Sequence, residues 1–249
     1  MEMRDVWEDL RFFAEHLSKL PISESMTLGK RGGFCVSTNN EFENWVYFPE
    51  RVKDIETVKK AMTFFGERGE TFMWPVYDGG SEILEASGLL HAGHLEAMSL
   101  DPERSVKDRV NPSITFRKIS RETSWQWTEC AWAAFAYGGG EPSGDYLALG
   151  EALCNDDDMS LYVAELEGHD VGAFLVTDEA ELIGVYYFAT KPEFRRKGVA
   201  ASMMNEICRL SGGRKIVLQA TPSGVPFYRA FGFEDLGAIE VYSTRADIF

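Results

Sequence analysis

The feature that most constrains this chain is a strand-like run ending in a basic turn, followed at once by a glycine and a helix. The segment reads ATKPEFRRKGVAASMMNEICRL, residues 189–210. Its basic tripeptide, residues 195–197, and Gly198 stand directly before apolar residues at helical spacing. The first turn of a helix exposes unpaired N–H groups at the positive end of the helix dipole. Flanking cations and a glycine that lets backbone approach closely therefore predict an anion-binding loop.

This loop matches neither of two widespread phosphate-binding motifs. The pattern GxxxxGK[ST] is absent, and the single glycine lacks the two companions of a dinucleotide-binding fingerprint. A basic triplet alone is usually solvated surface, so the interpretation depends on the rest of the chain.

The overall charge limits the class of partner. The chain of 249 residues has 25 Lys and Arg against 40 Asp and Glu, a formal charge of −15, and both halves are acidic. A field of that sign repels nucleic acid and anionic membranes, so we expect neither as a partner.

Helical and strand-like segments alternate along the whole sequence, which predicts an α/β fold. The polar, proline-containing segment DPERSVKDRVNPS, residues 101–113, is the expected linker between domains at 1–105 and 113–249. The later part is expected to open with a strand and a helix (123–135), a glycine-rich loop (137–146) and three antiparallel strands.

A second short motif follows the basic loop, with one predicted strand between them. It reads VPFYRAFGF, residues 225–233. Together the two motifs resemble the GNAT superfamily of acyl-CoA-dependent N-acyltransferases. The family pattern [Q/R]-x-x-G-x-[G/A] is matched by Arg195, Gly198 and Ala200, and F-Y-x-x-x-G-F by Phe227, Tyr228, Gly232 and Phe233. The resemblance covers about residues 113–245.

The resemblance implies a fold and a donor site. It implies a mixed, mostly antiparallel central sheet flanked by helices, in which strands 183–190 and 215–221 run parallel and then diverge. The pantetheine arm of acetyl-CoA would lie between these strands, and backbone amides at the start of the helix would hold the pyrophosphate. The residues expected at the donor are Phe188, Ala189, Thr190, Arg195, Arg196, Lys197, Gly198, Val199, Ala200 and Thr221. Thr221 replaces an asparagine that is frequent in the family, which puts one side-chain contact in doubt.

The resemblance also implies roles in catalysis. Tyr228 is the expected acid at the leaving sulfur, and Glu181 is the expected base for the amine, with Tyr186 as the second choice. The competing interpretation of Tyr228 is an ordinary core residue, and that of Glu181 is a solvated residue at the end of a strand. The expected reaction is transfer of an acetyl group from acetyl-CoA to a primary amine of a small molecule or peptide.

The first half holds a weak copy of the second. A shift of 144 residues places 51–99 on 195–243 with nine identities in 49 positions, so an internal repeat is predicted. Asp54 then falls on Gly198 and Leu84 on Tyr228, so the first copy is expected to be a shortened, degenerate GNAT-like domain without a donor site.

Other classes of function stay open at this point. The chain could bind acyl-CoA without turnover, or serve as a structural protein on an inherited fold. The four cysteines lack metal or redox spacing, and His91 and His94 have no further ligand cluster, so we expect no metal and a cytoplasmic protein with reduced thiols. The sequence does not indicate an oligomeric state.

Overall fold

The structure is a computed structural model that describes residues 2–30, 32–40, 43–76, 79, 81–106, 109–135 and 140–246. The chain forms two compact units. Unit I consists of Met98–Gln219 and Gly224–Asp235, and unit II of Glu2–Ala97, Ala220–Ser223 and Leu236–Phe249. No helix among the described residues is long and apolar enough to cross a membrane.

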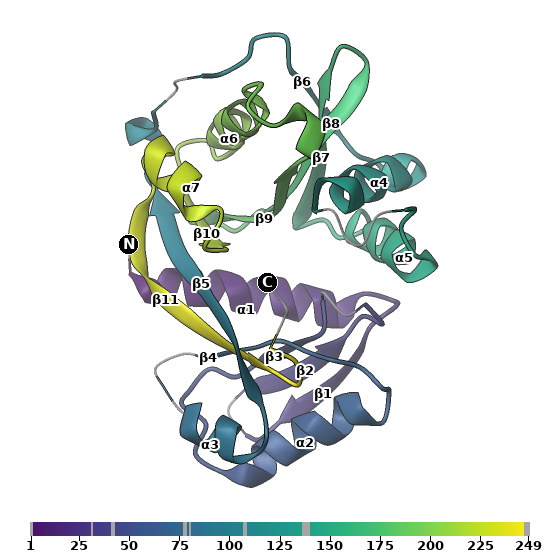
Figure 1. Cartoon of the computed structure of the whole chain (residues 1–249), viewed down its shortest axis with the longest axis vertical. Helices are drawn as coiled ribbons and strands as arrows, with labels where there is room; N and C mark the ends of the chain where they lie inside the picture. The colour runs from purple at the N-terminus through teal and green to yellow at the C-terminus, as the bar shows by residue number, and fades with distance from the viewer. Residues whose placement is uncertain are drawn as a thin grey trace. The chain divides into compact units, whose positions relative to one another are not determined.

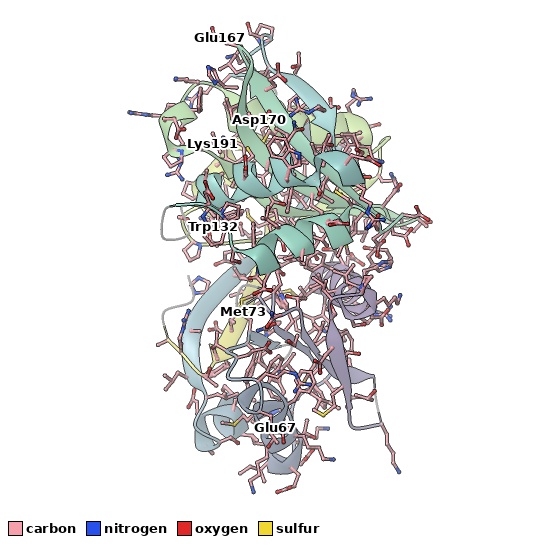
Figure 2. All side chains as sticks on the ribbon, turned by 90° about the vertical axis from the view of Figure 1, so that its right-hand side faces the viewer. Glu67, Met73, Trp132, Glu167, Asp170 and Lys191 are labelled. Carbon is pink, nitrogen blue, oxygen red and sulfur yellow. The ribbon has the colours of Figure 1, made fainter. Side chains whose placement is uncertain are left out.

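Unit I is built on five strands in the order β10-β9-β8-β7-β6 (Figure 1). Their bounds are β6 Thr115–Lys118, β7 Met159–Leu166, β8 His169–Thr177, β9 Leu182–Thr190 and β10 Lys215–Ala220. The strands from β6 to β9 are antiparallel, and β10 is parallel to β9. Glu167 and Gly168 form the β7–β8 turn with positive φ, as two-residue hairpins require; Figure 2 shows Glu167 at the tip.

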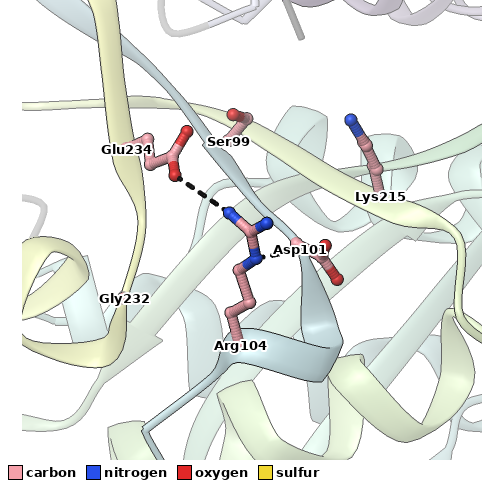
Figure 3. A pocket seen from close by; sticks show the side chains of 6 residues that line it. All are labelled: Ser99, Asp101, Arg104, Lys215, Gly232 and Glu234. Atoms are coloured by element: carbon pink, nitrogen blue, oxygen red, sulfur yellow. Dashed lines mark ion pairs between the residues drawn. The ribbon is translucent and has the colours of Figure 1, made fainter.

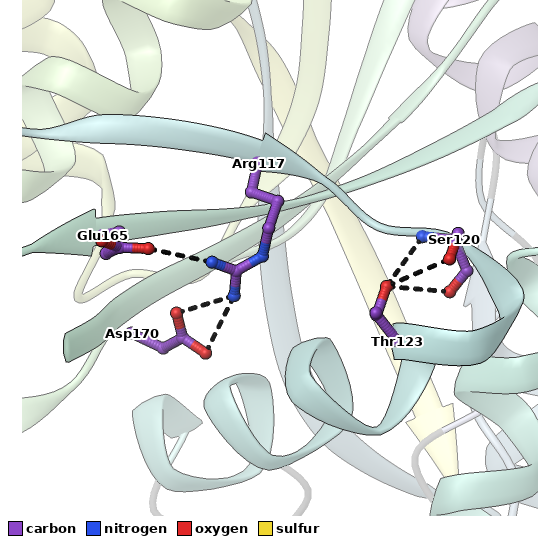
Figure 4. A network of polar contacts seen from close by, with 5 residues as sticks. All are labelled: Arg117, Ser120, Thr123, Glu165 and Asp170. Atoms are coloured by element: carbon purple, nitrogen blue, oxygen red, sulfur yellow. Dashed lines mark hydrogen bonds and ion pairs between the residues drawn. The ribbon is translucent and has the colours of Figure 1, made fainter. Parts of the chain in front are cut away.

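Arg117 fastens the edge strand β6 to its neighbours. Its guanidinium donates to Glu165 on β7 at 2.9 Å and to Asp170 on β8 at 3.0 Å (Figure 4). The three side chains are between a quarter and two-fifths exposed, so the network stabilises the edge modestly and mainly fixes its register.

Helices cover this sheet. Unit I contains α4 Ser124–Phe135, α5 Gly144–Leu153, α6 Val199–Leu210 and α7 Val225–Phe231. Helix α4 packs on β7, β8 and β9, with α5 against it, and α6 packs on β8 and β9 (Figure 1). The prediction of a loop over residues 137–146 is wrong from residue 144 on, where α5 begins. Ser143 accepts a hydrogen bond from the Tyr146 amide and caps this helix. Residues 137–139 lie outside the described residues.

Unit II begins with α1 Met3–Lys19, whose buried stripe includes Val6, Leu10, Phe13 and Leu17. It contains an antiparallel sheet of β1 Glu24–Leu28, β2 Gly33–Ser37 and β3 Trp45–Tyr47, followed by α2 Ile55–Gly66, β4 Trp74–Val76 and α3 Ser81–Ala86. Its apolar core includes Phe65 and Phe72, whose rings stack with centroids 4.5 Å apart.

Two strands are shared by the units. Strand β5, Leu90–Leu100, leaves unit II after Ala97, and β11, Glu234–Ser243, leaves unit I after Asp235. Through them the strand order continues as β4-β11-β5-β10-β9-β8-β7-β6. This confirms the expected mixed, mostly antiparallel sheet flanked by helices. Pro75 lies in β4 at the end of that order, where a residue without an N–H is tolerated.

The element positions support the internal repeat. Helices α2 and α6 each span 12 residues and begin at Ile55 and Val199, which are 144 positions apart. The same offset separates the first residues of α3 and α7, Ser81 and Val225, and those of β5 and β11, Leu90 and Glu234. In unit II a parallel bridge joins Trp45 to Met73 just before β4, as β9 pairs in parallel with β10 in unit I.

Candidate active site in unit I

Strand β9 contains a bulge that separates its end from β10. Ala189 pairs with Ala173 and Tyr186 with Leu175, so β9 has one extra residue between them, and Tyr187 has a φ of 52°. The register pairs β9 with β10 only from Leu182 to Gly184. The later residues of β9 pair with β8 on their other side. The edge of β9 that faces away from β8 is therefore open over Phe188 and its neighbours.

The basic loop leads into α6 through left-handed backbone. Arg196 has a φ of 64° and Gly198, the N-cap residue, a φ of 81°. No side chain caps this helix. The first-turn amides, including those of Val199 and Ala200, have no carbonyl partner within a helix that starts here, so they are available to an anion.

The three cations of the loop differ in their roles. Arg195 donates to the carbonyl oxygens of Thr190 at 3.3 Å and Ala134 at 3.4 Å, so it joins the ends of β9 and α4. The Lys197 ammonium lies 4.6 Å from the centroid of the Phe194 ring. Arg196 is exposed and has no ion pair among the described residues. Arg196 and Lys197 therefore supply positive charge to the loop, whereas Arg195 acts as a structural tie.

The predicted linker is bonded to both helices of this site. The Val106 amide donates to the Phe231 carbonyl at the end of α7, at 2.9 Å. The Asn111 side chain donates to the Lys197 carbonyl at 3.0 Å, and the Asn111 amide to the Ser202 hydroxyl on α6 at 2.9 Å. Sequence reasoning missed Asn111, because its partners lie 86 and 91 positions away.

Tyr228 lies in a cage of aromatic rings. It is 8% exposed, and its ring centroid lies 5.8 Å from that of Phe188, 5.3 Å from Phe227 and 5.4 Å from Phe233. Burial raises the pKa of its hydroxyl well above the ordinary value, and no charged neighbour contributes to the shift. The hydroxyl is therefore protonated throughout the neutral range.

The second motif has a clear local structure. Gly232 ends α7 with a φ of 111°, and the Tyr228 carbonyl accepts from the amides of Gly232 at 3.1 Å and Phe233 at 3.0 Å. This glycine-terminated helix end returns Phe233 to the Tyr228 ring. The motif residues therefore hold Tyr228 in place.

Three other residues predicted for the site, Glu181, Tyr186 and Thr221, are not among the described residues whose rings surround Tyr228. Glu181 is exposed and directly precedes β9, seven residues before the Phe188 that contacts Tyr228. At ~3.3 Å per residue these two positions lie roughly 20 Å apart, so the structure does not bring Glu181 to Tyr228. Tyr186 is 9% exposed within β9. The Thr221 hydroxyl interacts with that of Ser223 at 3.1 Å in the turn before α7.

Unit I also has a small pocket that shares only Gly232 with the two motifs. Its volume is about 200 Å³, and Figure 3 shows its lining: Ser99, Asp101, Arg104, Lys215, Gly232 and Glu234. Arg104 is paired with Asp101 at 3.7 Å and Glu234 at 3.8 Å, and none of the predicted donor residues lines the pocket. We assign it no role in the chemistry.

The residues around the loop fit a coenzyme A thioester. The Thr190 hydroxyl oxygen is buried and has no hydrogen-bond partner among the described residues. Thr190 is the last residue of β9, and Arg196 and Lys197 follow it in the chain after a short turn. An extended amide chain with phosphates at one end would meet backbone groups, a hydroxyl and cations in that order.

Comparison with known proteins agrees with the motifs. Residues 157–235 match the model of the acetyltransferase (GNAT) domain. A GCN5-related N-acetyltransferase from Kribbella flavida superposes with a TM-score of 0.68 at 12% identity, over 98% of this chain and 96% of that chain. A second such enzyme, from Sphaerobacter thermophilus, gives 0.59 at 15% identity over 86% and 78%.

A tandem GNAT protein from the clavulanic acid biosynthesis pathway superposes with a TM-score of 0.58 at 11% identity, over 94% of this chain and 87% of that chain. A search of curated protein sequences finds no match. At these identities the solved structures show the fold alone. Residues 157–235 match the GNAT domain model, and the chain as a whole has the same fold as these solved N-acetyltransferase structures.

Proposed function

We propose that unit I binds acetyl-CoA and transfers its acetyl group to a primary amine of a small molecule or peptide. The observation that carries this proposal is the position of Tyr228. Its ring lies against Phe188, on the stretch of β9 that β10 does not pair. A proton-bearing side chain thus borders the open strand edge on which we propose that the donor binds.

The donor would be held by residues already described. Backbone groups of Phe188, Ala189 and Thr190 would pair with the amides of the pantetheine arm as an added strand does. The amides from Arg196 to Ala200 would hold the pyrophosphate, with Arg196 and Lys197 adding charge. The thioester supplies an activated acyl group.

The reaction needs one bond made and one broken. The neutral amine nitrogen attacks the thioester carbonyl carbon, a C–N bond forms, the C–S bond breaks, and sulfur leaves with the electron pair. A thiol has an ordinary pKa of about 8.5 and a phenol of about 10, and burial raises the pKa of Tyr228 further. Full proton transfer from Tyr228 to the thiolate is therefore uphill. We assign Tyr228 the role of a hydrogen-bond donor to the developing thiolate.

The proton lost by the amine must leave by another route. Glu181 does not reach Tyr228 through the fold, so we propose that the proton passes to water. A solvent route predicts that substitution of Glu181 by Gln leaves turnover within a factor of about two, whereas loss of a true general base costs about 10²–10⁴-fold.

The position of the expected base, Glu181, at the other end of β9 from Phe188 favours a second function, acyl-CoA binding without turnover. One experiment separates the two. The protein is incubated with acetyl-CoA and a panel of small amines, aminoglycosides and peptides, and free thiol is followed. Amine-dependent thiol release supports transfer. Binding of acetyl-CoA with no release above the hydrolytic background supports the binding module, and no binding at all refutes both.

A further inference from the structure

Residues 109–113, here called the strap, cross the start of α6 and bond to the basic loop. The carboxamide of Asn111 is used at both ends. Its Nδ2 donates to the Lys197 carbonyl at 3.0 Å, and its Oδ1 accepts from the Ser113 amide at 3.0 Å. Because the Ser113 amide binds Oδ1, the Nδ2 group of the carboxamide is the one that faces the loop.

The backbone of Asn111 anchors the strap to α6. Its amide donates to the Ser202 hydroxyl at 2.9 Å, and that hydroxyl donates to the Asn111 carbonyl at 3.3 Å. Ser202 is 1% exposed, so this double contact is shielded from water. The strap therefore has a fixed position over the first turn of α6.

The strap also touches Gly198 directly. A Cβ atom at Gly198 would lie 2.6 Å from the Arg109 carbonyl oxygen and 3.0 Å from Asn111 Cβ. Arg109 itself has a φ of 64°, a conformation that surrounding contacts must maintain in a non-glycine residue. The glycine of the family motif is thus required here by the strap, independently of any ligand.

These contacts determine the direction of one amide. In a trans peptide the C=O and N–H of the same plane point in opposite directions. Since Asn111 holds the Lys197 carbonyl on the strap side, the Gly198 N–H points away from the strap. Without the hydrogen bond from Asn111, the Lys197–Gly198 peptide plane can rotate, because glycine accepts both signs of φ. The Lys197 carbonyl oxygen would then face a bound anion.

We propose that Asn111 is a positioning residue that sets the Lys197–Gly198 peptide plane for the phosphates of the donor. The inference rests on the proposed function for its ligand, and on the hydrogen bonds alone for its geometry. Arg109, next to the same glycine, adds an exposed cation from outside the motif.

The test compares two asparagines with the same kind of bond. Asn111→Asp keeps an oxygen for the Ser113 amide but places a second oxygen against the Lys197 carbonyl. The control is Asn155→Asp, because Asn155 Nδ2 donates to the Glu151 carbonyl at 3.0 Å at an exposed helix end. We expect the Kd of coenzyme A, by calorimetry, to rise about tenfold in Asn111→Asp, as for one lost hydrogen bond to a charged group. Asn155→Asp should bind as wild type.

Two further readouts separate positioning from simple destabilisation. The KM for acetyl-CoA should rise while kcat and the KM of the amine stay constant. With ¹⁵N-glycine labelling, the Gly198 amide resonance of the ligand-free protein should shift in Asn111→Asp and not in Asn155→Asp. Equal Kd values in the two variants, or an unmoved Gly198 resonance, would overturn the inference. If wild type binds no coenzyme A, the proposed function fails, and the resonance still decides the peptide geometry.

Discussion

The close contact between Gly198 and the strap predicts how much Gly198→Ala lowers the free energy of unfolding. Gly198→Ala places a Cβ 2.6 Å from the Arg109 carbonyl oxygen, about 0.8 Å short of ordinary contact at 3.4 Å. The left-handed φ of 81° adds about 1–2 kcal/mol for any residue with a Cβ. Backbone must move to relieve the overlap, which disturbs the Asn111 hydrogen bonds at about 1 kcal/mol each.

Gly212→Ala is the matched control. Gly212 has a φ of 61° in the turn after α6, and a Cβ there would meet nothing within 4 Å. It therefore carries the conformational cost without the contact. We expect unfolding free energies lower by about 1–2 kcal/mol for Gly212→Ala and by roughly 2–4 kcal/mol for Gly198→Ala.

The assay is thermal and urea unfolding of both variants beside wild type. At about 2–4 °C per kcal/mol, Gly198→Ala should melt several degrees below Gly212→Ala. Coenzyme A affinity should also fall in Gly198→Ala alone, since the displaced strap no longer holds the loop. Equal melting temperatures for the two variants would refute the tight packing of the strap on Gly198.

Three further predictions follow from the described contacts. Tyr228→Phe should keep the ring cage and coenzyme A affinity but lower kcat about 10²-fold; a loss below twofold would remove the hydroxyl from the mechanism. Calorimetry should give one acetyl-CoA site per chain, because the Asp54 carboxylate already occupies the start of α2 by accepting from the Thr57 amide at 2.8 Å; two sites would contradict the degenerate copy. Burial raises the pKa of Tyr47 from about 10 to about 12, so the stability contributed by its protonated hydroxyl is present below pH 10 and is lost as the pH rises toward 12. Tyr47→Phe should therefore flatten the fall of the urea midpoint between pH 10 and 12. An unchanged slope in this range would contradict the assignment.

Local features of unit I were predictable from sequence because each is decided by neighbours in the chain. The helix after Gly198 follows from its apolar spacing, and the helix end at Gly232 follows from a glycine placed where left-handed backbone is needed. The repeat was predictable for the same reason, since each copy carries its own helix start.

The contacts between distant segments were not predictable in this way. Asn111 reads as part of a polar linker, and only the fold places it beside Lys197. Glu181 is the expected base because it directly precedes the strand that leads to the proposed donor site, but an extended strand of nine residues separates it from the far end of that strand. Helix α5 was missed because its glycine-rich approach hid the Ser143 cap, although a serine before an acidic first turn is a usable signal.

The shared strand β11 has a consequence for how the protein is made. Unit II starts at the second residue, but its β4 pairs with Glu240–Tyr242 near the opposite end of the chain. During synthesis β4 cannot pair with β11 until residues 240–242 have left the ribosome. The early strands of unit II meanwhile remain without that partner, which favours chaperone capture of nascent chains. A gene fragment that stops at residue 105 would encode a unit lacking its final strand.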